Sequence, residues 1–379
     1  MTSPRTLSFR SSDGDAPFGA APARATILAH LPRCQAVCRE GTGPHGASYD
    51  TTAIGFEQGR SAMNDIAQHT PVLLERTLEL LAPALADPGS VYVDGTLGHA
   101  GHTEAVLQRF GNARAVGIDR DTSAIELSRI RLAPFSDRVD LVHAVYDEIA
   151  EVLSDLGIAK AAGVLLDLGV SSMQIDQAER GFSYMKDAPL DMRMDRSTGI
   201  TAQDVVDTYS EAELRRILNQ YGEERMAPRI ASAIFRARGS LQTTGDLADL
   251  VQRSLPAAVR HRSNGHPAKR TFQALRIEVN DELSVLRRAV RAAIGCLGVG
   301  GRMVVLSYHS LEDRIVKQTI ADLSTDHTPL DLPVSLESER PELRQLVRGA
   351  EKASAAEQST NPRSASVRLR AIERVREAS

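Results

Sequence analysis

Three aspartates in this sequence each follow a short apolar run, and their spacing would let them serve one ligand together. Asp94 follows Val-Tyr-Val, Asp119 follows Ala-Val-Gly-Ile, and Asp167 follows Gly-Val-Leu-Leu. A short run rich in β-branched residues and bounded by glycine predicts a buried strand. In a parallel sheet the carboxyl ends of the strands share one edge, where ligands bind. A single acid of this kind would most simply cap a helix, whereas three at successive strand ends favour a ligand site.

A glycine-rich turn follows Asp94, with glycines at positions 95, 98 and 101. Glycine lets the backbone approach a ligand closely, and the amides of a following helix point toward it. The spacing by threes differs from the Gly-x-Gly-x-x-Gly pattern of dinucleotide-binding proteins, and no lysine follows to bind phosphates. Asp119 lies 25 residues after Asp94, near the spacing at which a carboxylate binds both ribose hydroxyls. These features fit a nucleoside with a small charged tail, such as S-adenosylmethionine; a tight turn without a ligand is the alternative.

Helical and strand patterns alternate in the segment that would position these acids. The expected strands are 91–94, 113–119, 139–144 and 163–167, and the expected helices are 70–81, 104–110, 122–132 and 147–156. This alternation predicts an α/β fold, with a parallel sheet and helices on both faces.

The alternation resumes near the C-terminal end of the chain. Apolar residues at steps of three and four predict one long helix over 275–294. A fifth strand within 300–309 would carry Ser307, His309 and Ser310 to the same edge as Asp167. His309 could there contact a substrate, accept a proton or form a structural hydrogen bond. Residues 324–360 are polar and predict a loop, and residues 366–372 alternate as a late strand.

Residues 173–268 interrupt the alternation with helical patterns alone. Helices are expected over 211–218, 224–238 and 244–254, with Thr244 as an N-cap. Residues 225–302 hold thirteen arginines and one lysine against five acids, a net charge of +9 within a chain of −4. A basic segment in an acidic protein is typical of a polyanion-binding face, although a solvated helix surface paired with acids elsewhere is the alternative.

The N-terminal segment and the cysteines indicate where the folded part begins and in which compartment the protein works. Residues 1–62 are rich in small and polar residues without periodicity and predict a disordered extension, so a protein that begins at Met63 should fold and work. Cys34, Cys38 and Cys296 are too few and too scattered for a disulfide framework or a zinc site, which indicates a reducing compartment and no metal. An apolar run of about 18 residues is absent, so we expect no membrane span and a cytoplasmic protein.

Longer motifs resemble those of the MraW family, the S-adenosylmethionine-dependent methyltransferases that modify cytosine N4 in 16S ribosomal RNA. The resemblance covers about residues 65–375 and rests on long motifs in the same order. They are His69-Thr-Pro-Val-Leu-Leu, Gly163-Val-Leu-Leu-Asp-Leu-Gly-Val-Ser-Ser172, Asp176-Gln-Ala-Glu-Arg-Gly-Phe-Ser-Tyr184, Pro189-Leu-Asp-Met-Arg-Met-Asp195, Tyr221-Gly-Glu-Glu-Arg, Arg270-Thr-Phe-Gln-Ala-Leu-Arg-Ile, Ser307-Tyr-His-Ser-Leu-Glu-Asp-Arg and Asn361-Pro-Arg-Ser.

The resemblance implies a class I methyltransferase fold, Rossmann-like, with a mostly parallel sheet and a helical insertion domain. The sheet domain would comprise residues 63–172 and 269–379, and residues 173–268 would form a lid over the site. The implied cofactor-binding residues are Ala100, Gly101, His102, Asp119, Tyr146, Asp167 and Gln174. Two of these depart from the family pattern, since Ala100 stands where glycine is common and Tyr146 where some relatives have phenylalanine. Alanine at a position that needs a positive φ would strain the turn.

The resemblance also implies a substrate and a reaction. For the mechanism, our own hypothesis is that Asp167, or backbone carbonyls beside it, accepts a hydrogen from cytosine N4, with His309 nearby, and that the base is unstacked to reach them. Lys269 and Arg270, within the basic segment, would grip the RNA backbone of the small ribosomal subunit. The rival interpretations are a methyltransferase that acts on DNA or protein, and a nucleotide-sensing or RNA-binding protein with a vestigial site. The sequence leaves the oligomeric state open, with a homodimer as one alternative.

Overall fold

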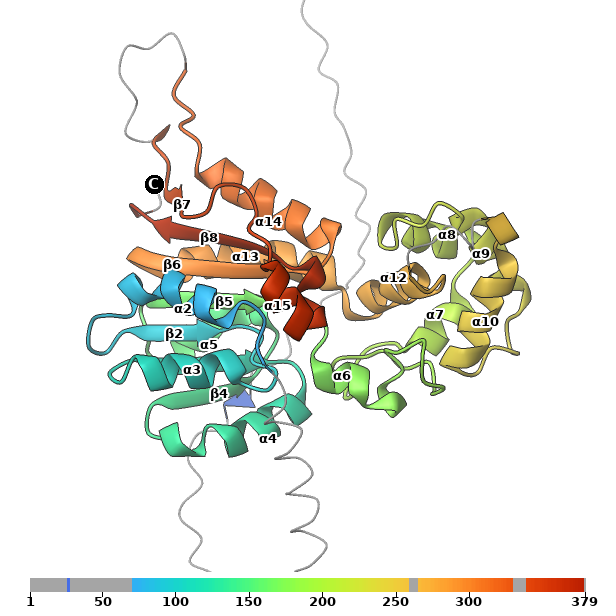
Figure 1. The fold of residues 1–379 in the computed structure, drawn as a ribbon, viewed down its shortest axis with the longest axis horizontal. Coiled ribbons are helices and arrows are strands. Elements are labelled where there is room, and N and C mark those ends of the chain that lie inside the picture. Colours follow the sequence, from blue (N-terminus) through green and yellow to red (C-terminus); the bar gives the residue numbers. More distant parts are fainter. Residues whose placement is uncertain (1–25, 28–69, 259–264, 330–338, 378–379) are drawn as a thin grey trace, which may run out of the picture.

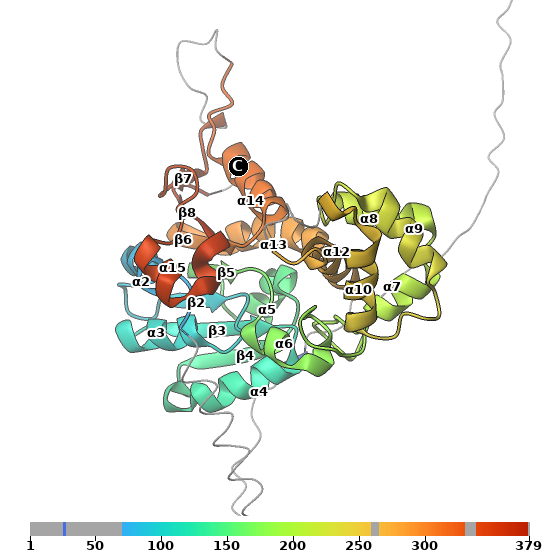
Figure 2. The same ribbon diagram turned by 45° about the vertical axis from the view of Figure 1, so that its right-hand side comes forward.

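The computed structural model describes residues 26–27, 70–258, 265–329 and 339–377. These residues form a sheet flanked by helices and, beside it, a separate group of helices (Figures 1 and 2). The predicted α/β fold with a helical insertion is confirmed.

Eight strands form one sheet within the described residues. Their bounds are β1 Thr26–Ile27, β2 Val91–Asp94, β3 Arg114–Asp119, β4 Val139–His143, β5 Ala161–Asp167, β6 Leu297–Ser307, β7 Leu343–Gln345 and β8 Arg368–Arg374. The spatial order is β1-β4-β3-β2-β5-β6-β8-β7, in which β4, β3, β2, β5 and β6 run parallel while β8 is antiparallel to both of its neighbours. The strand order reverses beside β2, which is where open α/β sheets bind ligands.

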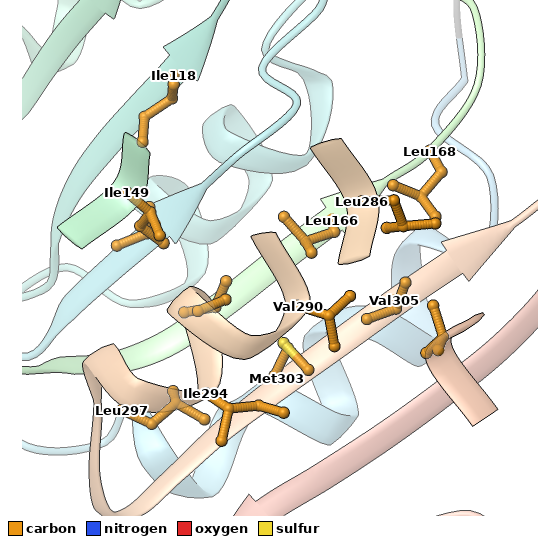
Figure 3. Close-up of a cluster of buried hydrophobic side chains, with 14 of the residues drawn as sticks. Ile118, Ile149, Leu166, Leu168, Leu286, Val290, Ile294, Leu297, Met303 and Val305 are labelled. Atoms are coloured by element: carbon orange, nitrogen blue, oxygen red, sulfur yellow. The ribbon is translucent and has the colours of Figure 1, made fainter. Parts of the chain in front are cut away.

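Helices cover both faces of the sheet, and the side chains of the central strands alternate between them. They are α2 Leu74–Leu81, α3 Gly101–Arg109, α4 Thr122–Arg131, α5 Ile149–Asp155, α13 Glu282–Cys296, α14 Ser310–Leu323 and α15 Ala355–Thr360. Leu166 of β5 packs in the core that α5, α13 and α14 cover, while Leu165 packs on the opposite face with α2 and α3. Figure 3 shows Val290 and Ile294 of α13 beside Met303 and Val305 of β6. Period-two alternation buried on both faces is what makes these strands almost wholly apolar.

The helical insertion has a core of its own. Its helices are α6 Ser172–Asp176, α7 Ala202–Thr208, α8 Glu211–Gln220, α9 Ala227–Arg236, α10 Thr244–Ser254 and α12 Lys269–Asn280. Apolar residues of α7, α8, α9, α10 and α12 belong to a single buried cluster. Helix α6 lies on the side of the insertion that faces the sheet domain (Figure 1). The N-cap of α10 is Thr243, one residue before the predicted Thr244, because Thr243 and Asp246 form a reciprocal capping box.

The predicted single helix over 275–294 is wrong, because Asp281 adopts a left-handed conformation (φ +49°) and separates α12 from α13. Leu275 of α12 is buried in the helical insertion, whereas Leu286 of α13 is buried against the sheet. The apolar steps of three and four continue across the break because each half is buried, although against a different partner. The domain division at residue 269 stays a prediction, and α12, which begins there, packs with the insertion.

Three further predictions concern the segment 324–360, the N-terminal extension and membrane spans. The segment 324–360 is less loop-like than predicted, because it holds β7 and α15. The disordered extension over 1–62 lies outside the described residues except at β1, where Thr26 and Ile27 pair with β4. Among the residues that the structure describes, no helix has the length and apolar character needed to cross a bilayer.

Candidate active site

A cavity of about 410 Å³ lies where the carboxyl ends of β2, β3, β5 and β6 face the helical insertion. Eight of the ten residues predicted for the site line it: Gly101, His102, Asp119, Tyr146, Asp167, Gln174, Lys269 and His309. The other two do not. Ala100 is fully buried within the glycine loop, and Arg270 is exposed and donates a hydrogen bond to the backbone carbonyl of Glu223 at 2.9 Å.

The glycine loop has the strained turn that the sequence indicated. Ala100 has φ +56° and is fully buried just before α3, so an alanine occupies a left-handed position that favours glycine. Gly98 also has a positive φ, and its amide donates to Asp119 Oδ2 at 2.8 Å. A Cβ on Gly95 would lie 2.6 Å from a side-chain carbon of Leu166. The loop is therefore held against the sheet, with backbone exposed to the cavity.

Asp119 lies at the end of β3 and lines the cavity. Its carboxylate accepts hydrogen bonds from the amides of Gly98 and Asp121, each at 2.8 Å. Burial raises the pKa of this carboxyl to about 6, against the lowering effect of both amide hydrogen bonds. Two amide donors therefore fix the orientation of the carboxylate at the edge of the cavity.

Asp94 also ends its strand at this edge, but it does not line the cavity. The carboxylate is only 2% exposed and accepts hydrogen bonds from Thr103 Oγ1 at 2.7 Å, the amide of Thr96 at 3.2 Å and Tyr92 Oη at 3.3 Å. Burial raises its pKa to about 6. The expectation that all three acids face a ligand is therefore wrong for Asp94, which instead ties the glycine loop to α3.

Asp167 lies at the end of β5, with both carboxylate oxygens close to polar side chains. Oδ1 accepts a hydrogen bond from Tyr308 Oη at 2.7 Å, and Oδ2 lies 3.8 Å from Nδ1 of His102. The amide of Asp167 donates to Thr96 Oγ1 at 2.6 Å. Burial raises the pKa of the carboxyl to about 7, with smaller contributions from the negative charges of Asp94 and Glu312. A carboxyl with this pKa can accept a proton near neutral pH.

Gln174 and Tyr146 complete the cofactor-binding set that was predicted. Gln174 Nε2 donates to Asp121 Oδ2 at 3.1 Å, and its Oε1 accepts the amide of Ser171 at 3.1 Å, so this side chain is held at both ends. Asp121 also forms a buried ion pair with Arg180 at 2.9 Å, which attaches the start of the insertion to the sheet domain. Tyr146 packs beside the sheet core, and burial raises its pKa.

His309 lies on the side of the cavity next to the insertion, where it caps α14. Its Nδ1 accepts the amide of Glu312 at 3.4 Å, and its Nε2 lies 3.2 Å from Glu312 Oε1. Glu282 of α13 is held by a bidentate pair with Arg276 at 2.8 and 2.9 Å. Ligand atoms of Glu282, His309 and Glu312 lie within 4.8 Å of one another, a separation that would suit a cation. Each of the three already contacts a protein group, since Glu282 pairs with Arg276 and His309 contacts Glu312.

Sequence reasoning missed several residues that line the cavity, notably Thr96, Arg276, Tyr308 and Glu312. Tyr308 and Glu312 flank His309 in the motif from 307 to 314. A polar residue followed three positions later by glutamate is a capping-box pattern that would have identified Glu312. The contact between Tyr308 and Asp167 joins residues 141 positions apart, so spacing along the chain carries no sign of it.

A family sequence model and individual relatives point to the same family. The sequence model of the MraW methylase family matches residues 66–375. The "Ribosomal RNA small subunit methyltransferase H" of Thermobifida fusca is 61% identical over 311 residues, which is 82% of this chain and 94% of that protein. Proteins with the same name are 58% identical in Saccharopolyspora erythraea, over 82% of this chain and 94% of the relative, and 56% identical in Nocardia farcinica, over 83% and 98%.

The matched region contains the glycine loop, Asp119, Asp167 and every other described residue that lines the cavity. It also contains the whole helical insertion, so the likeness extends over both parts of the fold. The chain therefore belongs to the MraW methylase family.

Proposed function

We propose that this protein transfers the methyl group of S-adenosylmethionine to the exocyclic N4 amine of a cytidine in the decoding region of 16S ribosomal RNA. Family membership and the names of the relatives support the reaction class and the substrate. The observation that carries the proposal is Asp167, a carboxyl with a pKa of about 7 at the wall of the cavity.

The residues around the glycine loop fit the cofactor. The backbone of Gly101 and His102 and the carboxylate of Asp119 would hold the charged tail and the ribose, while Tyr146 would lie along the adenine. Gln174, fixed by Asp121, would close the cavity beside them. When bound, the cofactor supplies an electrophilic methyl group on a sulfonium.

The protein's own task is to orient the amine and exclude water. Cytosine N4 is a weak nucleophile because its lone pair is delocalised into the ring. A carboxylate that accepts a hydrogen from N4 localises the lone pair and removes the proton that the product must lose. Asp167 is suited to this because Tyr308 occupies Oδ1, which leaves Oδ2 turned toward the cavity and His102. His309, which also lines the cavity, would contact the base.

The RNA would reach this cavity across the helical insertion. Lys269 lines the cavity, and Arg270, Arg225 and Arg229 are exposed on neighbouring turns. Such cations bind phosphates without regard to sequence and fix the register of the strand. Arg260 and Arg262, which belong to the same basic segment, lie outside the described residues. A target base within a folded RNA must be unstacked to enter an enclosed cavity.

We place the reaction in the cytoplasm, since three scattered cysteines suit a reducing compartment. The sequence leaves the oligomeric state open, with a homodimer as one alternative. Light scattering at micromolar concentration would decide between a monomer and a dimer.

The test is methyl transfer from labelled S-adenosylmethionine to small ribosomal subunits that lack the modification, followed by nucleoside analysis. We expect label in N4-methylated cytidine, and about a 10²-fold or greater loss of turnover for Asp167→Asn with cofactor and RNA bound normally. Label in another nucleoside would overturn the target, and label in DNA would favour the rival methyltransferase. Cofactor binding without any transfer would favour an RNA-binding protein with a vestigial site.

A further inference from the structure

The side chain of His102 faces the site acid, although the proposed function uses only the backbone of this residue. His102 lies in the first turn of α3, and its ring is buried. Nδ1 lies 3.8 Å from Asp167 Oδ2, and Nε2 lies 3.1 Å from the carbonyl oxygen of Val72. The ring therefore bridges a backbone carbonyl and a carboxylate.

The contact with Val72 determines where the ring carries its hydrogen. A carbonyl oxygen can only accept, so the 3.1 Å contact is a hydrogen bond only when Nε2 carries the proton. In the neutral ring the lone pair is then on Nδ1, the atom that faces Asp167. His102 can therefore take a proton from the side of the carboxylate without breaking its own anchor.

The surroundings of Asp167 favour its protonation. Burial is the main cause, and the negative charges of Asp94 on β2 and Glu312 on α14 add to it, against the hydrogen bond from Tyr308 to Oδ1. Asp167 can therefore accept a proton near neutral pH, with Nδ1 of His102 on the side of its other oxygen.

We propose that His102 receives, through Asp167, the proton that cytosine N4 loses on methylation, an inference that rests on the proposed function. The N4 lone pair forms the bond to the methyl carbon, and the electrons of the broken carbon–sulfur bond remain on sulfur, which becomes a neutral thioether. The electrons of one N4–H bond return to nitrogen, and its proton passes to Asp167 Oδ2 and then to His102 Nδ1. The imidazolium releases that proton to water when the products leave.

His102 therefore acts through Asp167 and does not itself touch the substrate. It faces Oδ2 of Asp167, while Tyr308 contacts Oδ1. The separation of 3.8 Å must shorten by roughly 1 Å for direct transfer, because a hydrogen bond to nitrogen needs about 2.7–3.2 Å. A rotation of the Asp167 side chain would be enough.

The test compares His102→Gln with the wild type in single-turnover methylation of unmodified small subunits from pH 5.5 to 9. Glutamine keeps an amide donor for Val72 but offers no base to Asp167. The matched control is His143→Gln, since Nε2 of His143 makes a similar contact with the carbonyl of Arg120, at 3.0 Å, and does not line the cavity.

We expect His102→Gln to bind cofactor within about threefold of wild type but to turn over roughly 10² times more slowly, while His143→Gln keeps the wild-type rate. The wild-type rate should fall as pH drops below the pKa of Asp167. Tyr308→Phe should move that fall to higher pH, because the lost hydrogen bond favours the carboxylate. In His102→Ala, added imidazole should restore part of the rate, which a purely structural role would not allow.

Three outcomes would overturn the role of His102 and leave the proposed function standing. They are a wild-type rate and pH profile for His102→Gln, a loss confined to cofactor affinity, or an Nδ1–H tautomer of His102 in the nitrogen NMR spectrum of the wild-type protein. The spectrum needs no turnover, so it decides even if both variants fail to fold. Absence of N4-methylcytidine with the wild-type enzyme would overturn the proposed function as well, and the two failures are thereby distinguished.

Discussion

Asp167 is held protonated by its surroundings at pH values where an exposed aspartate is charged. Its pKa is raised from 3.8 to about 7, chiefly by burial. A carboxyl whose folded pKa is raised stabilises the fold fully below its unfolded pKa, and this contribution is lost as pH rises through the folded pKa. The contribution of Asp167 to the free energy of unfolding therefore decreases as pH rises from about 4 to about 7.

Asp167→Asn should consequently stabilise the protein above pH 7 while it removes activity. Asparagine can still accept the hydrogen bond from Tyr308 and carries no charge to desolvate. We expect a gain of roughly 1–3 kcal/mol at pH 8 that shrinks toward pH 4, measured by urea unfolding at both values. Asp204→Asn is the control of opposite sign, since capping contacts with Thr201 lower the Asp204 pKa and its stabilisation is lost as pH falls. An equal gain for Asp167→Asn at both pH values would contradict this account.

Individual site residues were predictable where a residue type and a strand end coincide. Asp119 and Asp167 follow β-branched runs, and the parallel sheet brings them to one edge. Asp94 shares that pattern and yet turns under the loop, because Thr103 Oγ1 and Tyr92 Oη lie close enough to bind it. Which of several strand-end acids faces solvent depends on such neighbours, and the pattern of a single strand does not reveal them.

Among the structural elements, the link from Gln177 to Asp195 at the start of the insertion folds closely back on itself. Gly181 has φ +72°, and a Cβ there would lie 2.3 Å from the carbonyl oxygen of Pro189 and 3.0 Å from the amide of Asp191. Gly199 has a similar φ of +80°, with nothing within 4 Å of the added atom. Substituting alanine at each glycine therefore separates two free-energy costs. At Gly199 only the positive φ is unfavourable, whereas at Gly181 the new Cβ also clashes with the backbone of Pro189.

Gly199→Ala should therefore destabilise the protein by about 1 kcal/mol, the cost of a left-handed alanine. Gly181→Ala should cost about 3 kcal/mol or more, because the backbone at Pro189 must also shift. Denaturant unfolding of both variants measures the difference. Equal costs would show that the link can move aside without loss.

The break between α12 and α13 is fixed by Asn280, which is 2% exposed. Its Nδ2 donates to the carbonyl of Met192 at 2.8 Å, and its Oδ1 accepts the amide of Met194 at 2.7 Å. Asn280→Ala leaves both backbone groups buried without these partners, so we expect a loss of about 2–4 kcal/mol in unfolding free energy. Asn219→Ala, on an exposed face of α8, is the control and should change little. A loss below about 1 kcal/mol for Asn280→Ala would mean that water replaces both contacts.

The sequence predicts helices and strands best where the apolar residues of a segment follow one spacing and pack in one core. The strands that end at Asp119 and Asp167 alternate with helices of ordinary length, and their positions agree with the structure within two residues. The break at Asp281 could not be predicted, because Leu275 and Leu286 satisfy the same helical spacing while packing in different cores. β7 spans three residues with one buried side chain, which is too short a pattern to distinguish from a loop.

At the scale of the whole molecule, the cavity belongs to both halves. Asp119 and Asp167 come from the sheet domain, whereas Lys269 and Gln273 come from α12 of the insertion. The ion pair between Arg180 and Asp121 attaches the insertion close to the site. The basic segment and the acids are thus parts of one surface, although they are far apart in the sequence.

A protein that begins at Met63 should fold and methylate RNA at the wild-type rate. The family match starts at residue 66, and the truncation removes β1, which contributes only two residue pairs to β4. The melting temperature and the methylation rate of the shortened and full chains make the comparison. A shortened chain that folds but loses activity would assign the first 62 residues a role in the reaction.

The position of the insertion in the chain also sets an order of events during synthesis. β5 ends at Asp167 and its partner β6 begins at Leu297, so 129 residues are translated between two neighbouring strands. At the usual pace of about 5–20 residues per second, this takes on the order of 10 s. Throughout that interval the nascent chain carries β5 as an open edge, while α7, α8, α9, α10 and α12 emerge and can bury their own core. The helical half can therefore fold on the translating ribosome before the sheet that bears Asp119 and Asp167 closes.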